Sequence, residues 1–295
     1  MVKLNAGSDR RKYMKKVALI NDLSGFGKCS LTAAIPVISV MGIQACPLPT
    51  AILSAQTDFG TYYCDDFTDR MDYFTDQWKQ MDVSFDGIYS GFLANSLQMK
   101  KVLRFLEQFE QKDTIYLADP VMGDNGKGYD VFSEELLKGM KELTRRADVI
   151  TPNLTELCLL GGVDYDTLIA HRQEPDYVKR IQEIGENLLT IASRPQTVMV
   201  TGIVHQKKGV DFVGNLAISA EESIYVENPY TGRRFSGTGD LFASVVCACM
   251  VKGISMKEAI EKATFFLKGA IEEASMQGID SNHGVPFEKY LSNLL

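Results

Sequence analysis

The residues with the clearest chemical potential form a glycine-rich turn in the last quarter of the chain. The run Phe235-Ser-Gly-Thr-Gly-Asp240 leads directly into a long apolar stretch that predicts a helix. Gly237 and Gly239 permit close approach of the backbone, and the start of a helix directs unpaired N–H groups toward a ligand. An anion fits such a turn, and each well-placed donor is worth about 3 to 4 kcal/mol when charge develops on an oxygen.

Asp240 lies at the mouth of this turn, and its carboxylate has two interpretations. As a general base it would accept a proton from an attacking hydroxyl group. As a structural residue it would cap the helix, because carboxylates are favoured in the first turn by the helix dipole. The turn alone leaves both interpretations open.

A second acidic motif, Asp119-Pro-Val-Met-Gly-Asp124, follows an apolar run that predicts a buried strand. Both carboxylates should therefore lie at one edge of a sheet. The next residues, Asn125-Gly-Lys127-Gly, are either a surface turn or a lid. As a lid they would close over phosphate groups, with Lys127 available to pair with negative charge.

Asn153 and Glu156 lie three residues apart in the run Thr151-Pro-Asn-Leu-Thr-Glu, at the start of a predicted helix. One interpretation is an oxygen-rich outer shell for Mg²⁺ and its waters. The other is a capping box, in which the two side chains bond to each other's backbone amides. The spacing favours neither.

Two features argue against other enzyme classes. Ser24-Gly-Phe-Gly-Lys is too short for the GxxxxGK[ST] phosphate loop, so its glycines predict a tight turn, either against a flat substrate or purely structural. His171, His205 and His283 have no Ser, Cys or metal-ligand partner at a diagnostic spacing, which weakens hydrolase interpretations that need a histidine base.

Short apolar runs alternate with longer stretches of helical period, which is the pattern of a mostly parallel sheet covered by helices on both faces. The predicted strands are Val17 to Asn21, Ala45 to Thr50, Gly87 to Ser90, Thr114 to Ala118, Val149 to Thr151 and Thr197 to Thr201, with an antiparallel β extension at Val210 to Ala217 and Ser223 to Val226. The predicted helices are Leu31 to Met41, Phe67 to Met81, Ser96 to Gln108, Ser133 to Arg145, Tyr177 to Ala192 and two more starting near Gly239 and Ser255. The polar residues that end these strands should converge on one crevice at the carboxyl edge of the sheet.

Composition sets the outer limits. The chain has 295 residues, 45% of them hydrophobic and 23% charged, and no linker-like stretch, so one domain over 15–295 is expected after a tag or disordered extension at 1–14. The formal net charge of −7 argues against a nucleic-acid partner. A phosphorylated small molecule remains compatible with this charge, because backbone amides and a metal ion can hold it.

Six cysteines without paired CxxC motifs predict buried, reduced thiols. The sequence contains neither a secretory apolar region nor an apolar run of about 18 residues, so we expect a cytoplasmic protein that is not embedded in a membrane.

Taken together, the run from Val17 to the C-terminus resembles the ribokinase-like superfamily and, within it, the pyridoxal kinases. Four motifs carry the resemblance because they occur in the family's order and approximate spacing. They are Gly91-Phe-Leu, Asp119-Pro-Val-Met-Gly-Asp, Thr151-Pro-Asn-Leu-Thr-Glu and Gly237-Thr-Gly-Asp240. The resemblance implies a three-layer sandwich, Asp240 as the base, and Gly237, Thr238 and Gly239 as an anion hole.

The resemblance also implies a nucleotide and metal region. It assigns Asp119, Asn153 and Glu156 to Mg²⁺ and ATP. Further nucleotide contacts are implied for Asp124, Lys127, Thr201 and Gly202.

For the substrate, Pro47-Leu-Pro-Thr50 is similar to the segment that borders the pyridine ring in pyridoxal kinases, which implies Thr50 and Gly91 in the pocket. Two departures concern the same pocket. Asp22 stands where relatives commonly carry a small hydroxyl residue, and Phe26-Gly27-Lys28 replaces an aromatic-Gly-His run. One hypothesis is that Asp22 favours the aminomethyl group of pyridoxamine over the aldehyde of pyridoxal by charge pairing.

The expected reaction is transfer of the γ-phosphoryl group of ATP to the 5′-hydroxymethyl group of a vitamin B6 vitamer. Three alternatives are a hydroxymethylpyrimidine kinase, whose family usually carries Cys at the position of Asp240, a sugar or nucleoside kinase, and a non-catalytic vitamin-binding protein. Because pyridoxal kinases are commonly homodimers, the resemblance also implies a homodimer.

Overall fold

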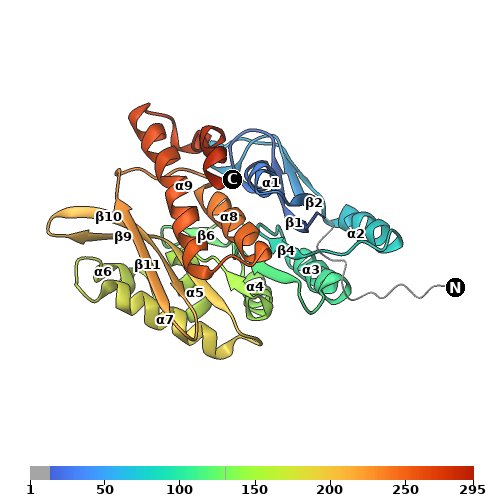
Figure 1. Cartoon of the computed structure of the whole chain (residues 1–295), viewed down its shortest axis with the longest axis horizontal. Helices are drawn as coiled ribbons and strands as arrows, with labels where there is room; N and C mark the ends of the chain where they lie inside the picture. The colour runs from blue at the N-terminus through green and yellow to red at the C-terminus, as the bar shows by residue number, and fades with distance from the viewer. Residues whose placement is uncertain (1–13, 130) are drawn as a thin grey trace.

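The computed structural model describes residues 14–129 and 131–295, and the predicted extension lies outside these ranges except for Met14. Within them the chain forms a sheet of nine strands in the order β11-β10-β9-β8-β5-β4-β1-β2-β3 (Figure 1). The strands are β1 Lys16–Ser24, β2 Gln44–Leu53, β3 Cys64–Asp66, β4 Gly87–Ser90, β5 Ile115–Ala118, β8 Val149–Ile150, β9 Thr197–Lys207, β10 Val210–Ile218 and β11 Ser223–Pro229. A separate two-stranded hairpin pairs β6 Gly123–Asp124 with β7 Lys127–Gly128.

The centre of the sheet is parallel and its two margins are antiparallel. Strands β2, β1, β4, β5, β8 and β9 pair in parallel in that order. β3 pairs antiparallel with β2, and β10 pairs antiparallel with both β9 and β11. The predicted mostly parallel sheet and its antiparallel extension are therefore confirmed, and the extension forms one margin of the same sheet.

Alternate residues of β1 explain why both faces of the sheet need a helical cover. Val17 and Leu19 point into one apolar cluster, whereas Ala18 and Ile20 point into the other. All four side chains are fully buried. A strand that is apolar on both faces must lie between two layers.

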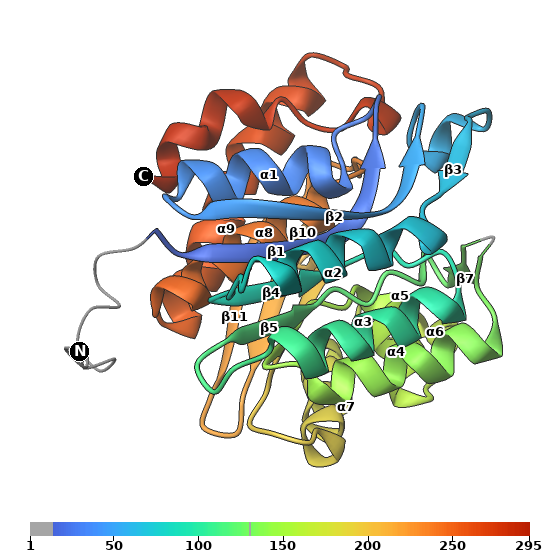
Figure 2. The same ribbon diagram turned by 90° about the vertical axis from the view of Figure 1, so that its right-hand side faces the viewer.

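Helices supply these two layers, as Figure 2 shows from the side. One layer contains α1 Ser30–Val40, α8 Thr238–Lys252 and α9 Met256–Met276. The other contains α2 Met71–Gln80, α3 Ser96–Phe109, α4 Glu134–Arg146, α5 Leu154–Gly161, α6 Tyr165–Ala170 and α7 Tyr177–Ile191. The expected three-layer sandwich is thus confirmed.

Single-turn 3-10 segments occur at Thr57–Phe59, Thr68–Arg70 and Ser281–His283, and a longer one at Phe287–Leu294 completes the described chain. Within the described residues, no helix has both the length and the apolar character that a membrane span requires. All six cysteines are free, but Cys46 is only half-buried and Cys64 is exposed, so burial of every thiol was a wrong expectation.

Candidate active site

The polar ends of the central strands meet at one edge of the sheet, where α8 also begins. Asn21 and Asp22 belong to the end of β1, Gly91 follows β4, and Asp119 follows β5. An isolated bridge joins Asn153 to Thr201, so the tips after β8 and along β9 lie side by side. The predicted convergence at the carboxyl edge is therefore present.

The glycine-rich turn owes its shape to Gly237, which is the N-cap of α8. Its φ of 78° lies in the left-handed region, and a Cβ there would stand 1.8 Å from the carbonyl oxygen of Lys28. The N-cap glycine has no side chain with which to cap the helix. The hydroxyl of Thr238 donates to the carbonyl oxygen of Phe235 at 3.0 Å, whereas a Cβ at Gly239 would meet nothing within 4 Å. The turn is therefore open to a ligand at Gly239.

Asp240 is in the first turn of α8, three residues after the N-cap Gly237. Its Oδ1 accepts a hydrogen bond from Asn21 Nδ2 at 3.2 Å. Burial raises the pKa of Asp240 to about 6, the Ser30 backbone amide opposes that rise, and the negative charge of Asp22 adds to it. Such a pKa suits a general base, because a base must be ionised near the working pH to accept a proton.

Asn21 is the residue of this site that sequence reasoning missed. It is 2% exposed and lies in β1 directly before Asp22. The signal in the sequence was a polar pair, Asn21-Asp22, at the end of an otherwise apolar strand. Its contact with Asp240 spans 219 positions of the chain, so spacing gave no sign of it.

Asp22 is buried beside Asp240 and is held by two serines. Ser24 Oγ donates to its Oδ2 at 2.8 Å, and Ser30 Oγ donates to its Oδ1 at 2.5 Å. Burial raises the pKa of Asp22, and both serine hydroxyls oppose that rise. The two serine hydroxyls therefore hold the Asp22 carboxylate in place and occupy part of its hydrogen-bond capacity.

The loop after β1 forms one wall near the glycine-rich turn. Phe26 is 54% exposed, and its ring lies 5.3 Å from the rings of both Phe59 and His283. Gly27 has a φ of 100°, and a Cβ there would stand 2.6 Å from Gln56 Cγ. His283 therefore belongs to an aromatic cluster with Phe26 and Phe59.

Thr50 and Gly91, both expected in the substrate pocket, lie close to the end of β1. The side chain of Thr50 is buried, and its hydroxyl donates to the carbonyl oxygen of Phe92 at 2.9 Å. Gly91 packs against the amide of Asn21, since a Cβ there would stand 2.4 Å from Asn21 Nδ2.

Three residues expected near the nucleotide and metal form a buried polar group. Asp119 accepts a hydrogen bond from Thr151 Oγ1 at 2.8 Å, and burial together with the charge of Asp240 raises the pKa of Asp119 to about 7. Asn153 and Glu156 form a full capping box at the start of α5. Glu156 Oε1 also accepts from the amide of Met122 at 3.2 Å, and burial raises its pKa well above the ordinary value.

The donor set at this edge fits a metal that needs few protein ligands. Within residues 14–129 and 131–295, no three His, Cys, Asp or Glu side chains are grouped to hold a metal ion. The charges of Asp119, Asp240 and Glu156 disfavour one another, and a cation would relieve this repulsion. Mg²⁺ commonly keeps several waters and binds through one or two carboxylates together with phosphate oxygens.

The predicted lid is a β-hairpin. Asn125 and Gly126 have φ values of 51° and 76°, which is the geometry of a two-residue hairpin turn. Arg234 ties the hairpin to the segment before the glycine-rich turn, because its guanidinium donates to Asp124 Oδ1 at 3.4 Å and to Asn125 Oδ1. Lys127 is exposed on the second strand of the hairpin.

Thr201 and Gly202 lie in β9 at the same edge. The amide of Thr201 donates to the carbonyl oxygen of Pro152 at 3.0 Å, and the amide of Gly202 donates to Asn215 Oδ1 at 3.2 Å. Thr201 is half-buried and Gly202 is exposed, so both are accessible to a ligand.

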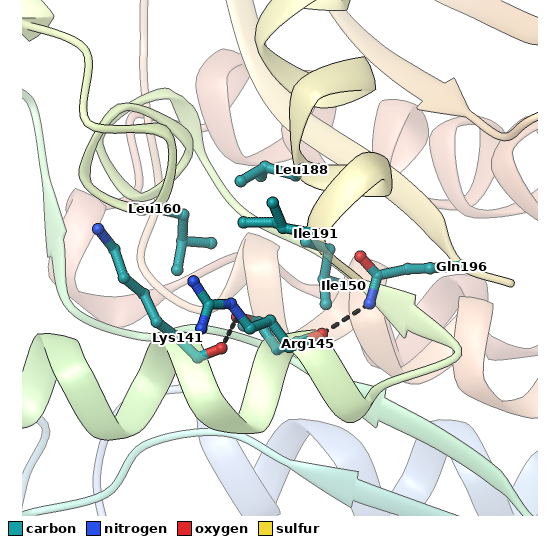
Figure 3. Close-up of a pocket in the computed structure, with 8 residues that line it drawn as sticks. Lys141, Arg145, Ile150, Leu160, Leu188, Ile191 and Gln196 are labelled. Atoms are coloured by element: carbon teal, nitrogen blue, oxygen red, sulfur yellow. Dashed lines mark hydrogen bonds between the residues drawn. The ribbon is translucent and has the colours of Figure 1, made fainter. Parts of the chain in front are cut away.

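A small cavity lies away from this site, near the carboxyl ends of α4 and α7, where β9 begins (Figure 3). Its volume is about 10 Å³, the space of a single water. It is lined by Lys141, Thr144, Arg145, Ile150, Leu160, Leu188, Ile191 and Gln196. It is too small for a substrate and does not contribute to the site described above.

Comparisons with known proteins agree with this geometry. The model of the family described as phosphomethylpyrimidine kinase matches residues 27–285. The pyridoxal kinase PdxY of Aliivibrio fischeri is 24% identical over 275 residues, which cover 90% of this chain and 91% of that relative.

Solved structures share the whole architecture. A candidate phosphomethylpyrimidine kinase from Bacteroides thetaiotaomicron, crystallised with pyridoxal, is 37% identical with a TM-score of 0.87 and covers 96% of each chain. The pyridoxal kinase of Lactobacillus plantarum is 25% identical with a TM-score of 0.84, over 96% of this chain and 97% of that one.

Proposed function

We propose that this chain, which belongs to the phosphomethylpyrimidine kinase family, transfers the γ-phosphoryl group of ATP to the 5′-hydroxymethyl group of a vitamin B6 vitamer. Pyridoxal, pyridoxamine and pyridoxine are the substrates in question. The proposed role is salvage of the vitamin as its 5′-phosphate.

One observation carries the proposal: the carboxylate of Asp240 lies in the first turn of α8, directly after the glycine-rich turn Gly237-Thr-Gly239. A hydroxyl group is a weak nucleophile until its proton is taken, and the transferred phosphoryl group carries negative charge that needs stabilisation. The carboxylate and the amides of Gly237, Thr238 and Gly239 supply these two functions. A vitamin-binding protein without turnover would need neither.

The proposed step is a single displacement. The substrate oxygen gives its proton to Asp240 and forms a bond to the γ-phosphorus, while the bond from that phosphorus to the bridging oxygen of ADP breaks. The amides at the start of α8 donate to the phosphoryl oxygens as they move. Asp240 then loses its proton to solvent or product, which restores the base.

The other residues of the edge receive proposed roles in binding. Asp119, Asn153 and Glu156 would hold Mg²⁺ directly or through its waters, and Mg²⁺ when bound neutralises charge on the nucleotide phosphates. Thr201 and Gly202 would contact the nucleotide. Asp124 and Lys127 would approach its phosphates from the hairpin β6–β7, where Arg234 supports the hairpin from the other side.

For the vitamer itself, the proposed pocket residues remain Asp22, Phe26, Gly27, Thr50 and Gly91. The exposed ring of Phe26 offers a face to the pyridine ring, which supports its role. We keep the hypothesis that Asp22 favours the aminomethyl group of pyridoxamine. Because two serine hydroxyls already occupy its oxygens, we expect the preference to be modest.

Hydroxymethylpyrimidine is the second candidate substrate, and the family match and the described function of the Bacteroides relative favour it. Asp240 argues against this substrate, because the resemblance implies that hydroxymethylpyrimidine kinases carry a cysteine at this position. The two candidates share a hydroxymethyl group on a flat nitrogen ring, so the same site chemistry serves both.

The experiment is a side-by-side measurement of kcat/KM for pyridoxal, pyridoxamine, pyridoxine and hydroxymethylpyrimidine with Mg²⁺-ATP, together with Asp240→Asn. We expect at least one vitamer to exceed hydroxymethylpyrimidine and the variant to lose about 10²- to 10⁴-fold of the rate. Turnover of hydroxymethylpyrimidine alone would reassign the substrate. Tight vitamer binding without ADP formation would support the non-catalytic alternative.

Two further parts of the proposal concern setting. A homodimer and a cytoplasmic location follow from the resemblance and from composition. Sedimentation equilibrium tests the first, and fractionation of the source cells tests the second.

A further inference from the structure

We propose that Asn21 is a positioning residue for the transfer reaction, and that its side-chain amide holds the Asp240 carboxylate in the orientation that receives the substrate proton. This inference rests on the proposed function, because it assigns Asn21 a part in the same reaction. It concerns a residue that neither the motifs nor the resemblance singled out.

The orientation of the Asn21 amide is fixed by its oxygen. Oδ1 accepts two backbone hydrogen bonds, from the amide of Phe92 at 2.8 Å and from the amide of Asp22 at 3.0 Å. A flipped amide would place its NH₂ group against both of these donors and its oxygen against a carboxylate. The Nδ2 group must therefore face Asp240, which it meets at 3.2 Å.

Gly91 packs against the other side of the Asn21 amide. It follows β4, the parallel neighbour of β1, and its amide donates to the carbonyl oxygen of Ile20 at 2.9 Å. Its missing side chain leaves room for the Asn21 amide, since a Cβ would stand within 2.4 to 2.9 Å of the Nδ2, Cγ and Oδ1 atoms. A larger residue at position 91 would therefore collide first with the Asn21 side chain.

The polarity of the contact suits a base. Nδ2 is a donor aimed at Oδ1 of the carboxylate, so it favours the ionised form that can accept a proton. A hydrogen bond in a buried setting also limits rotation of the Asp240 side chain. Asn21 lies behind the carboxylate and is 2% exposed, so it has no access of its own to a substrate.

The test is a set of three variants with the vitamer that the wild type uses best. Asn21→Ala removes the amide, Asn21→Asp keeps its shape but replaces the donor with a carboxylate, and Gly91→Ala displaces the amide without changing it. We expect kcat to fall about 10- to 100-fold in each, the range for loss of a hydrogen bond to a charged group. In the two Asn21 variants, KM for the vitamer and for ATP should stay within about twofold, because the Asn21 amide touches neither ligand.

A matched control separates positioning from general loss of packing. Gln196 is also a buried amide, and its Nε2 donates to the carbonyl oxygens of Thr144 and Ala147 at 2.6 and 2.7 Å, at the opposite edge of the sheet. Gln196→Ala should lower the melting temperature without lowering kcat. If it lowers kcat as much as Asn21→Ala does, the positioning role is overturned.

Coupling to Asp240 gives the decisive comparison. In an Asp240→Ala background, Asn21→Ala should change the residual kcat by no more than about twofold, because the group that it positions is gone. An undiminished effect in that background overturns the inference, as does wild-type kcat in both Asn21 variants.

Crystal structures of the wild type and of Asn21→Ala distinguish a failure of this inference from a failure of the proposed function. A wild type that phosphorylates no vitamer and no hydroxymethylpyrimidine refutes the proposed function alone. In that event, an Asp240 carboxylate that stays in place in Asn21→Ala overturns the positioning role, and one that moves or takes several orientations supports it.

Discussion

The acid limb of the pH profile is the most direct test of Asp240 as the base. Burial raises the pKa of its carboxyl group to about 6, with the charge of Asp22 adding to the rise and the Ser30 amide and Asn21 opposing it. A base acts only when ionised, so kcat/KM should be constant above about pH 7 and fall as pH drops through 6. At pH 5 it should be about one-tenth of the plateau, because the ionised fraction falls tenfold per unit below the pKa.

The assay is initial-rate kinetics with limiting vitamer from pH 4.5 to 8.5 at constant ionic strength, with circular dichroism at each pH to confirm that the protein stays folded. Nucleotide and vitamer also titrate in this range, so an enzyme variant must identify the limb. Asp22→Asn removes a negative charge that raises the pKa of Asp240, so it should move the limb to lower pH. Substrate ionisation cannot respond to that change.

Two results would refute the reasoning. One is a profile that is flat between pH 5 and 8 while the protein remains folded. The other is an acid limb that Asp22→Asn leaves in place, because it would then belong to the substrates or to a group remote from Asp22.

Three further predictions concern neighbouring residues. Asp119→Asn should raise the free energy of unfolding at pH 8 by on the order of 2 to 4 kcal/mol but change it little at pH 4, as measured by denaturant titration. Burial raises the pKa of Asp119 to about 7, so the native state binds more protons than the unfolded state does. The wild type therefore loses stability as pH rises from about 4 to 7, and the neutral Asn does not. Gly237→Ala should lower kcat at least about 100-fold in a steady-state assay, because its Cβ would collide with the Lys28 carbonyl oxygen and displace the amides of the turn. Arg234→Ala should raise KM for ATP several-fold with a melting temperature close to wild type, since it frees the hairpin β6–β7 but removes only an exposed ion pair; an unchanged KM would leave the hairpin without a role in nucleotide binding.

The strands of the sheet centre could be predicted because their sequences are apolar on both faces. Gly87–Ser90 was predicted exactly, and the other central strands differed mainly at their ends. β9 continues six residues beyond the predicted end at Thr201, because pairing with β10 stabilises a half-exposed extension that has no apolar run of its own. β3 was missed because Cys64-Asp-Asp66 is a short, acidic edge strand without an apolar run, and it pairs with β2 alone.

The helices followed their apolar spacing, but two short ones did not stand out. α5 was expected only as a helix start, and the six-residue α6 was not predicted at all, because so short a segment shows little periodicity. The segment expected as one helix from Phe67 to Met81 begins with a 3-10 turn at Thr68–Arg70.

For the site, motifs identified the groups but not their contacts. Asp22 and Asp119, which strand-end placement predicted at one edge, both lie near Asp240. The hydrogen bond from Thr50 to the carbonyl oxygen of Phe92, which follows β4, could not be predicted, because the sequence does not reveal that partner. Asn21 was missed because its partners come from β4 and α8, and such long-range contacts exist only in the folded chain.

The distance of 219 positions between Asn21 and Asp240 has a consequence for biosynthesis. A ribosome releases the β1 loop early and the glycine-rich turn late, so no nascent chain that ends before α8 carries a working centre. Such a chain also exposes the apolar face of the sheet that α8 and α9 later cover, including Tyr89 of β4 and Leu117 of β5, and would be a natural client for chaperones. Premature termination in this gene should therefore yield aggregating fragments and no partially active enzyme.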